Sequence, residues 1–170
     1  LTLRNLKARP RPCGYWLSAA ATATVDRLQQ LGVEIMRVAE PGAVLGESYR
    51  ETARTSGERS DVRGTIADAA SVLKVEVDLV RGVLDAPMGS YYVPLAQPLS
   101  NLIVAALEPD TQNSFFANRI QDALQIQARV VTEPTMRLER LLPSSNLKHA
   151  ADCLEDVSYS GGRGLDKRLV

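Results

Sequence analysis

A strict alternation of apolar and charged residues from Leu73 to Leu79 constrains the fold more than any other feature of the sequence. The apolar positions are Leu73, Val75, Val77 and Leu79, and the charged positions between them are Lys74, Glu76 and Asp78. Successive side chains of a β-strand point to opposite faces, so this pattern gives one apolar face and one charged face. Because strands of a parallel sheet are covered on both faces, the pattern predicts a half-buried antiparallel or edge strand.

The beginning of the chain carries a second local pattern, a strand followed by a helix and another strand. Residues 14–17 form an aromatic and apolar run, Ser18 is a candidate N-cap, and residues 20–31 contain helix formers with one apolar face. We expect Gly32 to end this helix, because glycine adopts positive φ without strain, and residues 33–38 to form the next strand. Strand–helix–strand units favour parallel strands, so a βαβ-like start is predicted.

The rest of the chain is interpreted from shorter patterns. We expect strands at residues 44–52, 62–66, 90–93 and 130–132, a polar loop at 54–63, a turn at 85–89, helices at 98–107 and 117–127, and an amphipathic segment at 134–142. The predicted fold class is α/β, a small mixed sheet with two or three packed helices. Residues 1–12 form an extended lead-in, 13–142 a single α/β domain, and 143–170 a polar, glycine-rich tail that we expect to be disordered.

Charge and hydropathy exclude two classes of function. The 170 residues contain 20 Lys and Arg against 20 Asp and Glu, so the chain lacks the basic excess typical of proteins that bind nucleic acid or anionic membranes. A membrane-spanning helix requires about 20 apolar residues. The most apolar run, Leu99 to Leu107, is about half as long. We therefore expect neither a nucleic-acid partner nor a membrane span.

Residues with catalytic or metal-binding chemistry are few. His149 is the one histidine, and the thiols Cys13 and Cys153 are far apart in the sequence. Zinc and iron–sulfur sites need three or four converging ligands, so no metal, cofactor or catalytic residue is assigned. The two cysteines form either one disulfide or two free thiols, which leaves the compartment open.

Several motifs have an ordinary structural interpretation that we prefer over a catalytic one. Ser18 lacks the flanking glycines of a nucleophile elbow, and Gly161-Gly162-Arg163-Gly164 lacks the Lys-Ser/Thr of a phosphate loop. Glu76 and Asp78 share one strand face, where solvation is expected rather than acid–base work. The aromatic pairs Tyr91-Tyr92 and Phe115-Phe116 either pack into the core or stack on a ligand, and packing is the preferred interpretation.

Three segments nevertheless resemble one protein family. They are residues 12–19 (PCGYWLSA), 86–99 (APMGSYYVPLAQPL) and 105–119 (AALEPDTQNSFFANR). Together with Gly32-Val33-Glu34-Ile35 they resemble the region that follows the catalytic domain in bacterial zinc carboxypeptidase-like proteins, relatives of carboxypeptidase A. The resemblance covers residues 12 to about 120 and ends near Arg140.

The resemblance implies a parent that removes C-terminal residues from peptides. In that family two His and one Glu hold the zinc, a Glu acts as general base and an Arg holds the substrate carboxylate. The zinc motif, His-x-x-Glu with a later His, has no match in this sequence. Because the chain also begins at Leu1 without Met, we expect a fragment or processed product whose zinc-binding catalytic domain lies upstream. Such a parent is consistent with a secreted or periplasmic location.

Three hypotheses follow for the function. The first is a non-catalytic domain that supports or docks on its own upstream peptidase domain, with an exposed apolar patch near Tyr91-Tyr92 or Phe115-Phe116. The second is an independent module that binds a small ligand or peptide at the helix starts near Ser18 and Gln97, where free amides favour an anion. The third is a stand-alone enzyme that uses carboxylates alone.

Overall fold

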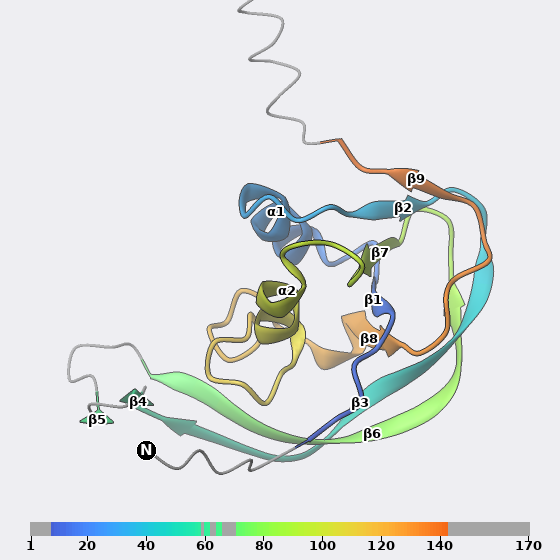
Figure 1. Ribbon diagram of the computed structural model, residues 1–170. Coiled ribbons are helices and arrows are strands. Elements are labelled where there is room, and N and C mark those ends of the chain that lie inside the picture. The colour runs from blue at the N-terminus through green and yellow to red at the C-terminus, as the bar shows by residue number, and fades with distance from the viewer. Residues whose placement is uncertain (1–7, 59, 62–63, 66–70, 143–170) are drawn as a thin grey trace, which may run out of the picture. The chain divides into compact units, whose positions relative to one another are not determined.

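The computed structural model describes residues 8–58, 60–61, 64–65 and 71–142. The chain divides into two compact units, Leu1–Arg140 and Leu141–Val170. The predicted tail at 143–170 lies outside the described residues, and so do His149, Cys153 and Gly161-Gly162-Arg163-Gly164. The fold and the candidate site therefore belong to the first unit (Figure 1).

The predicted α/β fold is confirmed, and a seven-stranded sheet dominates it. Its order is β6-β3-β8-β1-β7-β2-β9, and every neighbouring pair is antiparallel. The strands are β1 (Gly14–Leu17), β2 (Met36–Val38), β3 (Gly42–Gly57), β6 (Val72–Ala86), β7 (Tyr91–Pro94), β8 (Gln127–Val130) and β9 (Leu138–Arg140). The helices are α1 (Thr22–Gln30), α2 (Ser100–Leu107) and the short 3₁₀ helix η1 (Leu124–Ile126), and β4 (Ser60–Asp61) pairs with β5 (Gly64–Thr65).

The predicted strand–helix–strand start is present as β1, α1 and β2, but β7 lies between the two strands in the sheet. β1 and β2 both pair antiparallel with β7, so they run parallel to each other but are not neighbours. Gly32 ends α1 with φ of +82°, as the sequence predicts. The helix begins at Thr22 rather than directly after Ser18, because the Ser18 hydroxyl accepts the amide hydrogen of Ala20 and closes a turn before the helix.

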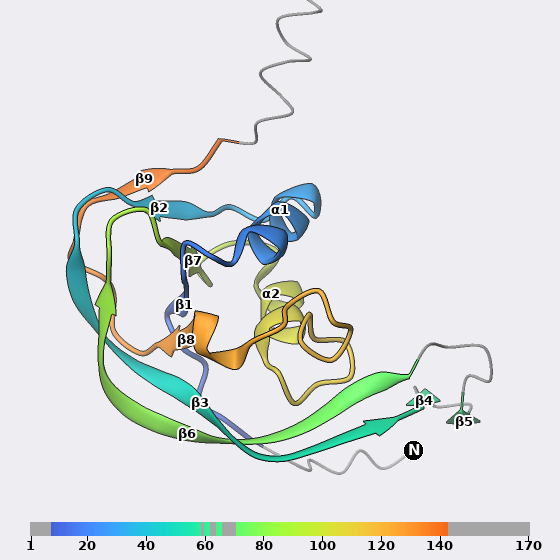
Figure 2. The ribbon, with the colours of Figure 1, turned by 180° about the vertical axis from the view of Figure 1, so that it is seen from behind.

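Strands β3 and β6 form one long curved ribbon, and α1 and α2 lie on its concave side in both views (Figures 1 and 2). The alternation in β6 is confirmed: Val75 and Val77 are buried against Tyr49 and Phe116, while the charged positions are exposed. β6 is also the edge strand of the sheet, as predicted.

The prediction of a polar loop at 54–63 is wrong for residues 54–57, which belong to β3. Arg54 pairs with Val75 across the ribbon, after a bulge between Glu51 and Ala53. The ribbon is exposed at this end, so polar residues occupy strand positions that a buried sheet would fill with apolar ones. The predicted turn at 85–89 also starts late, because β6 continues to Ala86.

The helix predicted at 117–127 is wrong, and only η1 forms there. Arg119 adopts a left-handed conformation with φ of +57°, and the Phe115 carbonyl accepts the amides of both Ile120 and Gln121. A helix cannot continue through this turn. The strand expected at 130–132 begins earlier as β8, and β9 occupies part of the segment at 134–142. Of the strand expected at 62–66, Gly64 and Thr65 form β5.

The central strand β1 is buried on both faces. Tyr15 and Leu17 are fully buried, and the Tyr15 hydroxyl reaches Glu108 at the end of α2. On the other face Trp16 packs with Tyr92 and Val130. The Tyr15 face carries the candidate site.

Candidate functional site

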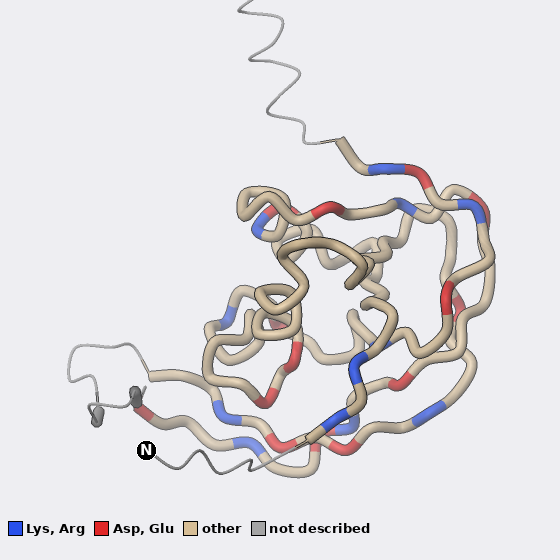
Figure 3. Tube along the Cα trace, in the orientation of Figure 1, with Lys and Arg blue, Asp and Glu red and all other residues tan. Residues whose placement is uncertain are grey.

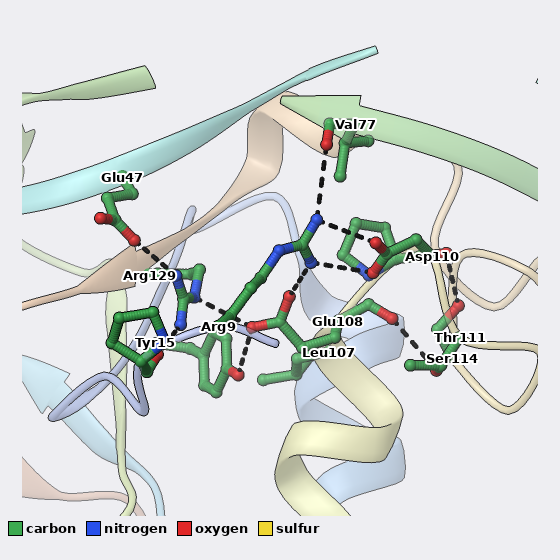
Figure 4. A network of polar contacts seen from close by, with 12 residues as sticks. Arg9, Tyr15, Glu47, Val77, Leu107, Glu108, Asp110, Thr111, Ser114 and Arg129 are labelled. Carbon is green, nitrogen blue, oxygen red and sulfur yellow. Dashed lines mark hydrogen bonds and ion pairs between the residues drawn. The ribbon is translucent and has the colours of Figure 1, made fainter. Parts of the chain in front are cut away.

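The most concentrated polar chemistry in the described part of the chain is a network centred on Glu108 (Figure 4). Glu108 follows the last turn of α2, where the backbone changes to an extended conformation. Arg129 projects from β8, Tyr15 from β1 and Arg9 from the lead-in, so elements separated by up to 120 residues in the sequence meet at one carboxylate. We call this set, together with Asp110 and Glu47, the Glu108 network.

Both oxygens of the Glu108 carboxylate are occupied. Tyr15 donates its hydroxyl hydrogen to Oε1 at 2.8 Å, and Arg129 Nε lies 3.0 Å from the same oxygen as an ion pair. Arg9 Nη1 donates to Oε2 at 2.8 Å. Glu108 is 6% exposed, and a carboxylate this buried is tolerable only when charged donors surround it.

Arg9 ties the lead-in to the domain. It donates from Nη1 to Asp110 Oδ1 at 2.9 Å, and its Nη2 lies 2.8 Å from Oδ2, a two-point pairing that fits the planar guanidinium. Nη2 also donates to the Val77 carbonyl of β6 at 3.4 Å. Burial alone would lower the pKa of Arg9, but the hydrogen bond and charge of Asp110 and the charge of Glu108 raise it overall.

Arg129 is the most buried charged residue of the network, with 2% of its surface exposed. Its Nη1 donates to Glu47 Oε2 at 2.5 Å, and its Nη2 donates to the Pro10 carbonyl. The bond to Pro10 gives the lead-in a second attachment, one residue beyond Arg9. The network thus combines two guanidinium groups with three carboxylates.

Two tyrosines near this network differ in their hydrogen bonding. Burial and the adjacent negative charge of Glu108 raise the pKa of Tyr15 well above its ordinary value. Burial raises the pKa of Tyr49 in the same way, with the Glu108 charge as the next cause. Tyr15 has a hydrogen-bond acceptor, whereas the buried Tyr49 hydroxyl has no partner among the described residues.

A cavity of about 360 Å³ adjoins the network. Among the residues that line it are Arg9, Arg11, Tyr15, Asn101, Thr111 and Arg129. Arg11 is exposed and has no ion-pair partner in the described part of the chain. The network residues that line the cavity already bind one another, so among the described side chains the Arg11 guanidinium and the Asn101 amide remain for a ligand.

The arrangement holds segments together rather than resembling an acid–base pair or an activated nucleophile. Glu108 accepts one hydrogen bond from Tyr15 and one from Arg9 and forms an ion pair with Arg129, so its carboxylate is the shared partner of three different segments. In the described ranges, no three His, Cys, Asp or Glu residues are placed to hold a metal ion. None of the described helices is long and apolar enough to cross a membrane.

The structure distributes the residues singled out in the sequence over separate places. Gln97 is occupied, because its side chain bonds both backbone groups of Glu34 and the Pro94 carbonyl. Ser18 accepts the amide hydrogen of Ala20, one residue before the N-cap Ala21. Among the described residues, no side chain bonds the first amides of α1 or α2, so the proposed anion site at the helix starts stays a hypothesis. Glu76 and Asp78 are exposed, as expected of a solvated strand face, and Asp78 pairs with Arg50 at 3.0 Å.

The aromatic pairs pack into the core, which confirms the preferred interpretation. Phe115 and Phe116 are both buried, and Tyr92 is buried while Tyr91 is half-buried. Phe115, Phe116 and Tyr92 therefore contribute almost no exposed apolar surface, and of the four aromatic residues Tyr91 alone is half-buried. Arg54 lies 5.3 Å from the centre of the Phe116 ring and covers it from the ribbon. Cys13 is half-buried and donates its thiol to the Val131 carbonyl at 3.5 Å.

From the sequence alone, no residue of the Glu108 network is assigned to a site, and Arg9, Arg129 and Glu47 are not singled out at all. Arg129 lies in a strand whose residues are all buried, but the sequence pattern predicts the strand at 130–132 and does not indicate this burial. A charge in such a strand needs a partner brought by another element. Arg9 and Glu47 gave no signal either, because both lie in segments that appear solvated when each is considered alone.

No family model matches the chain, and no curated protein or solved structure matches it either.

Proposed function

We propose that this chain is a non-catalytic domain from the C-terminal end of a zinc metallocarboxypeptidase-like protein, where it supports or docks on the peptidase domain. The observation that carries the proposal is the attachment of the lead-in by the Glu108 network. Glu108 and Asp110 belong to the segment that resembles this family most specifically, and both bind Arg9. The residues behind the resemblance thus hold the segment through which an upstream domain would connect.

Such an attachment suits a supporting domain. A free linker lets two domains reorient. Here two ion pairs of Arg9 and a hydrogen bond from Arg129 to the Pro10 carbonyl hold the lead-in against the domain, which would shorten the linker to an upstream domain and limit its reorientation. In this proposal the zinc, its ligands and the peptide substrate belong to the upstream domain, and proteolysis takes place there.

The reading frame upstream of Leu1 tests the parentage. We expect a His-x-x-Glu motif followed by a later His, because those ligands hold the zinc in the family that the chain resembles. An upstream frame without zinc ligands would contradict the proposal.

The chain itself provides a second test. Purified protein supplied with Zn²⁺ is expected to release no C-terminal residue from peptides, measured by amino-acid analysis. Metal-dependent release would overturn the non-catalytic assignment. If the upstream domain is found, Arg9→Ala in the longer protein should lower its melting temperature and peptidase activity, while Asp78→Ala at an exposed ion pair should change neither.

A binding module for a small anion or peptide is the second candidate, and the cavity beside Arg11 favours it. A ligand carboxylate there would pair with a cation that has no partner among the described residues. Thermal unfolding with acetate, phosphate and short peptides tests this idea, since a ligand that binds the folded state raises the melting temperature. Saturable stabilisation that Arg11→Ala removes would favour the binding module over the supporting domain.

A further inference from the structure

The edge strand β6 forms backbone hydrogen bonds with β3 on one side only. The Val131 amide donates to the Leu45 carbonyl, so odd-numbered residues of β3 turn toward β8 in this stretch and even-numbered ones toward β6. The even-numbered residues of β6 are opposite them, as in the pair Ser48 and Val80. Backbone groups of odd-numbered β6 residues therefore point away from the sheet.

Two contacts confirm this direction, and both lie in the first half of the edge. The Leu73 amide donates to the Ala117 carbonyl at 2.9 Å, and the Val77 carbonyl accepts from Arg9. Beyond them the outward groups are those of Leu79, Arg81, Val83 and Asp85. Nothing within the described ranges forms a backbone hydrogen bond with these four. An open edge of this length is a template for another strand.

The side chains along this open edge include exposed valines and charged residues without ion-pair partners among the described residues. Val83 is 73% exposed and Val80 is 43% exposed. Arg81 and Asp85 are exposed too, and neither has an ion-pair partner in the described part of the protein. Because Arg81, Val83 and Asp85 alternate along the strand, they share one face, with the apolar residue between two opposite charges.

We propose that the open edge of β6 pairs antiparallel with β6 of a second copy of this chain, across a two-fold axis at Val83. This register sets Val83 opposite Val83 of the partner subunit and Arg81 opposite Asp85 of the partner subunit. The same residues then meet twice by symmetry, as a closed two-fold interface requires. Each outward-facing pair exchanges two backbone hydrogen bonds, and the two sheets become one continuous sheet.

Charge selects this register and this partner. Centring the axis on Arg81 or on Asp85 places like charges opposite each other, which is destabilising. Centring it on Gly82 or Leu84 gives neither charge an opposite partner, whereas centring it on Val83 pairs both charges with their opposites. The register also sets Leu84 of the partner subunit across from Gly82. A Cβ added at Gly82 would meet no atom within 4 Å, so that position has room for a neighbouring side chain.

Sedimentation of the full chain over a dilution series tests the proposal. We expect a monomer–dimer equilibrium at concentrations up to about 500 μM, since a single pair of edge strands makes a small interface. Arg81→Glu should weaken dimerisation by ~10-fold or more, because it sets like charges opposite each other in both symmetry-related pairs. Asp85→Arg should weaken it similarly, and the double variant should restore it.

The controls separate this pairing from general charge effects. Glu76→Arg reverses an exposed charge on the first half of the same strand and should leave dimerisation unchanged. Circular dichroism should show every variant folded, because the altered side chains lie at the surface. A chain that stays monomeric, a dimer indifferent to Arg81→Glu, or a double variant no better than the single ones would each overturn the proposal. None of these outcomes depends on the carboxypeptidase parentage.

Discussion

The Glu108 network and the outer face of the β3–β6 ribbon use the same ionic chemistry in opposite surroundings. The Arg129 and Glu108 side chains are 2% and 8% exposed, whereas Arg50 and Asp78 on the ribbon are 68% and 57% exposed. Residues of both signs recur along the β3–β6 ribbon, as the blue and red segments of Figure 3 show. Both places contain arginine–carboxylate contacts of about 3 Å. The buried charges cannot return to water without unfolding, but the exposed ones remain solvated when their partner is lost.

This difference shows which ion pairs specify the fold. A buried charge is tolerated only with its partners present, so the Glu108 network requires the lead-in, β1, β8 and the end of α2 to meet in one arrangement. The ribbon pairs impose no such requirement, because their exposed charges remain solvated without a partner. Four predictions test this contrast, in order of decreasing effect.

Arg129→Met should destabilise the protein by about 3–5 kcal/mol, because it leaves Glu47 and Glu108 without their shared cation. Urea unfolding followed by circular dichroism measures the change. Arg50→Met on the ribbon is the matched control and should cost at most about 0.5 kcal/mol. Equal losses for the two variants would remove the contrast between the regions.

Alkaline pH should unfold the protein through the tyrosines of the network. The pKa values of Tyr15 and Tyr49 are raised in the folded state, so their stabilising effect is complete below the ordinary tyrosine pKa near 10. Above that pH the unfolded chain loses these protons first, and stability falls by about 1.4 kcal/mol per pH unit for each tyrosine. Urea unfolding at pH 8, 10 and 11 measures the slope. A stability that is flat from pH 8 to 11 would contradict the burial of these hydroxyls.

Tyr15→Phe and Tyr49→Phe should differ although both tyrosines are buried. Tyr15→Phe removes a hydrogen bond to a charged carboxylate and should cost about 1.5–3 kcal/mol. Tyr49→Phe removes a hydroxyl that has no partner among the described residues, so it should be neutral or slightly stabilising. The two melting temperatures report the difference, and a larger loss for Tyr49→Phe would show that its hydroxyl is bonded in solution.

Asp78→Ala should have the smallest effect, at most about 0.5 kcal/mol, because its ion pair with Arg50 is exposed. The same urea titration measures it, and 1 M NaCl should abolish what difference remains. A loss above about 1 kcal/mol would place this pair with the buried ones.

The sequence predicts those parts of the fold that depend on local patterns of residues. The alternation at Leu73–Leu79 predicts a half-buried edge strand, and Gly32 predicts the end of α1, because each depends on neighbours within a few residues. The length of the β3–β6 ribbon was not predictable in this way. Arg54 and Ser56 have loop-like chemistry, and only pairing with Val75 and Leu73 makes them part of a strand.

The candidate site was less predictable than the fold, since it depends on contacts between distant residues. Glu108 and Asp110 appeared within a segment that resembles a family, but nothing local indicated that Arg9 would bind both. The prediction of a helix at 117–127 failed because it, too, considered only local residues. Its helix formers are overridden by the turn at Arg119, which allows Phe115 and Phe116 to be buried.

The position of β1 has a consequence for how the protein folds during its synthesis. Leu17 is synthesised early, yet its partners in the sheet are Tyr91 on one side and Gln127 on the other. A growing chain therefore carries this central strand without either neighbour until most of the domain has been translated. Release before Val130 would leave that strand open along one edge, so an incomplete product should aggregate where the complete one folds.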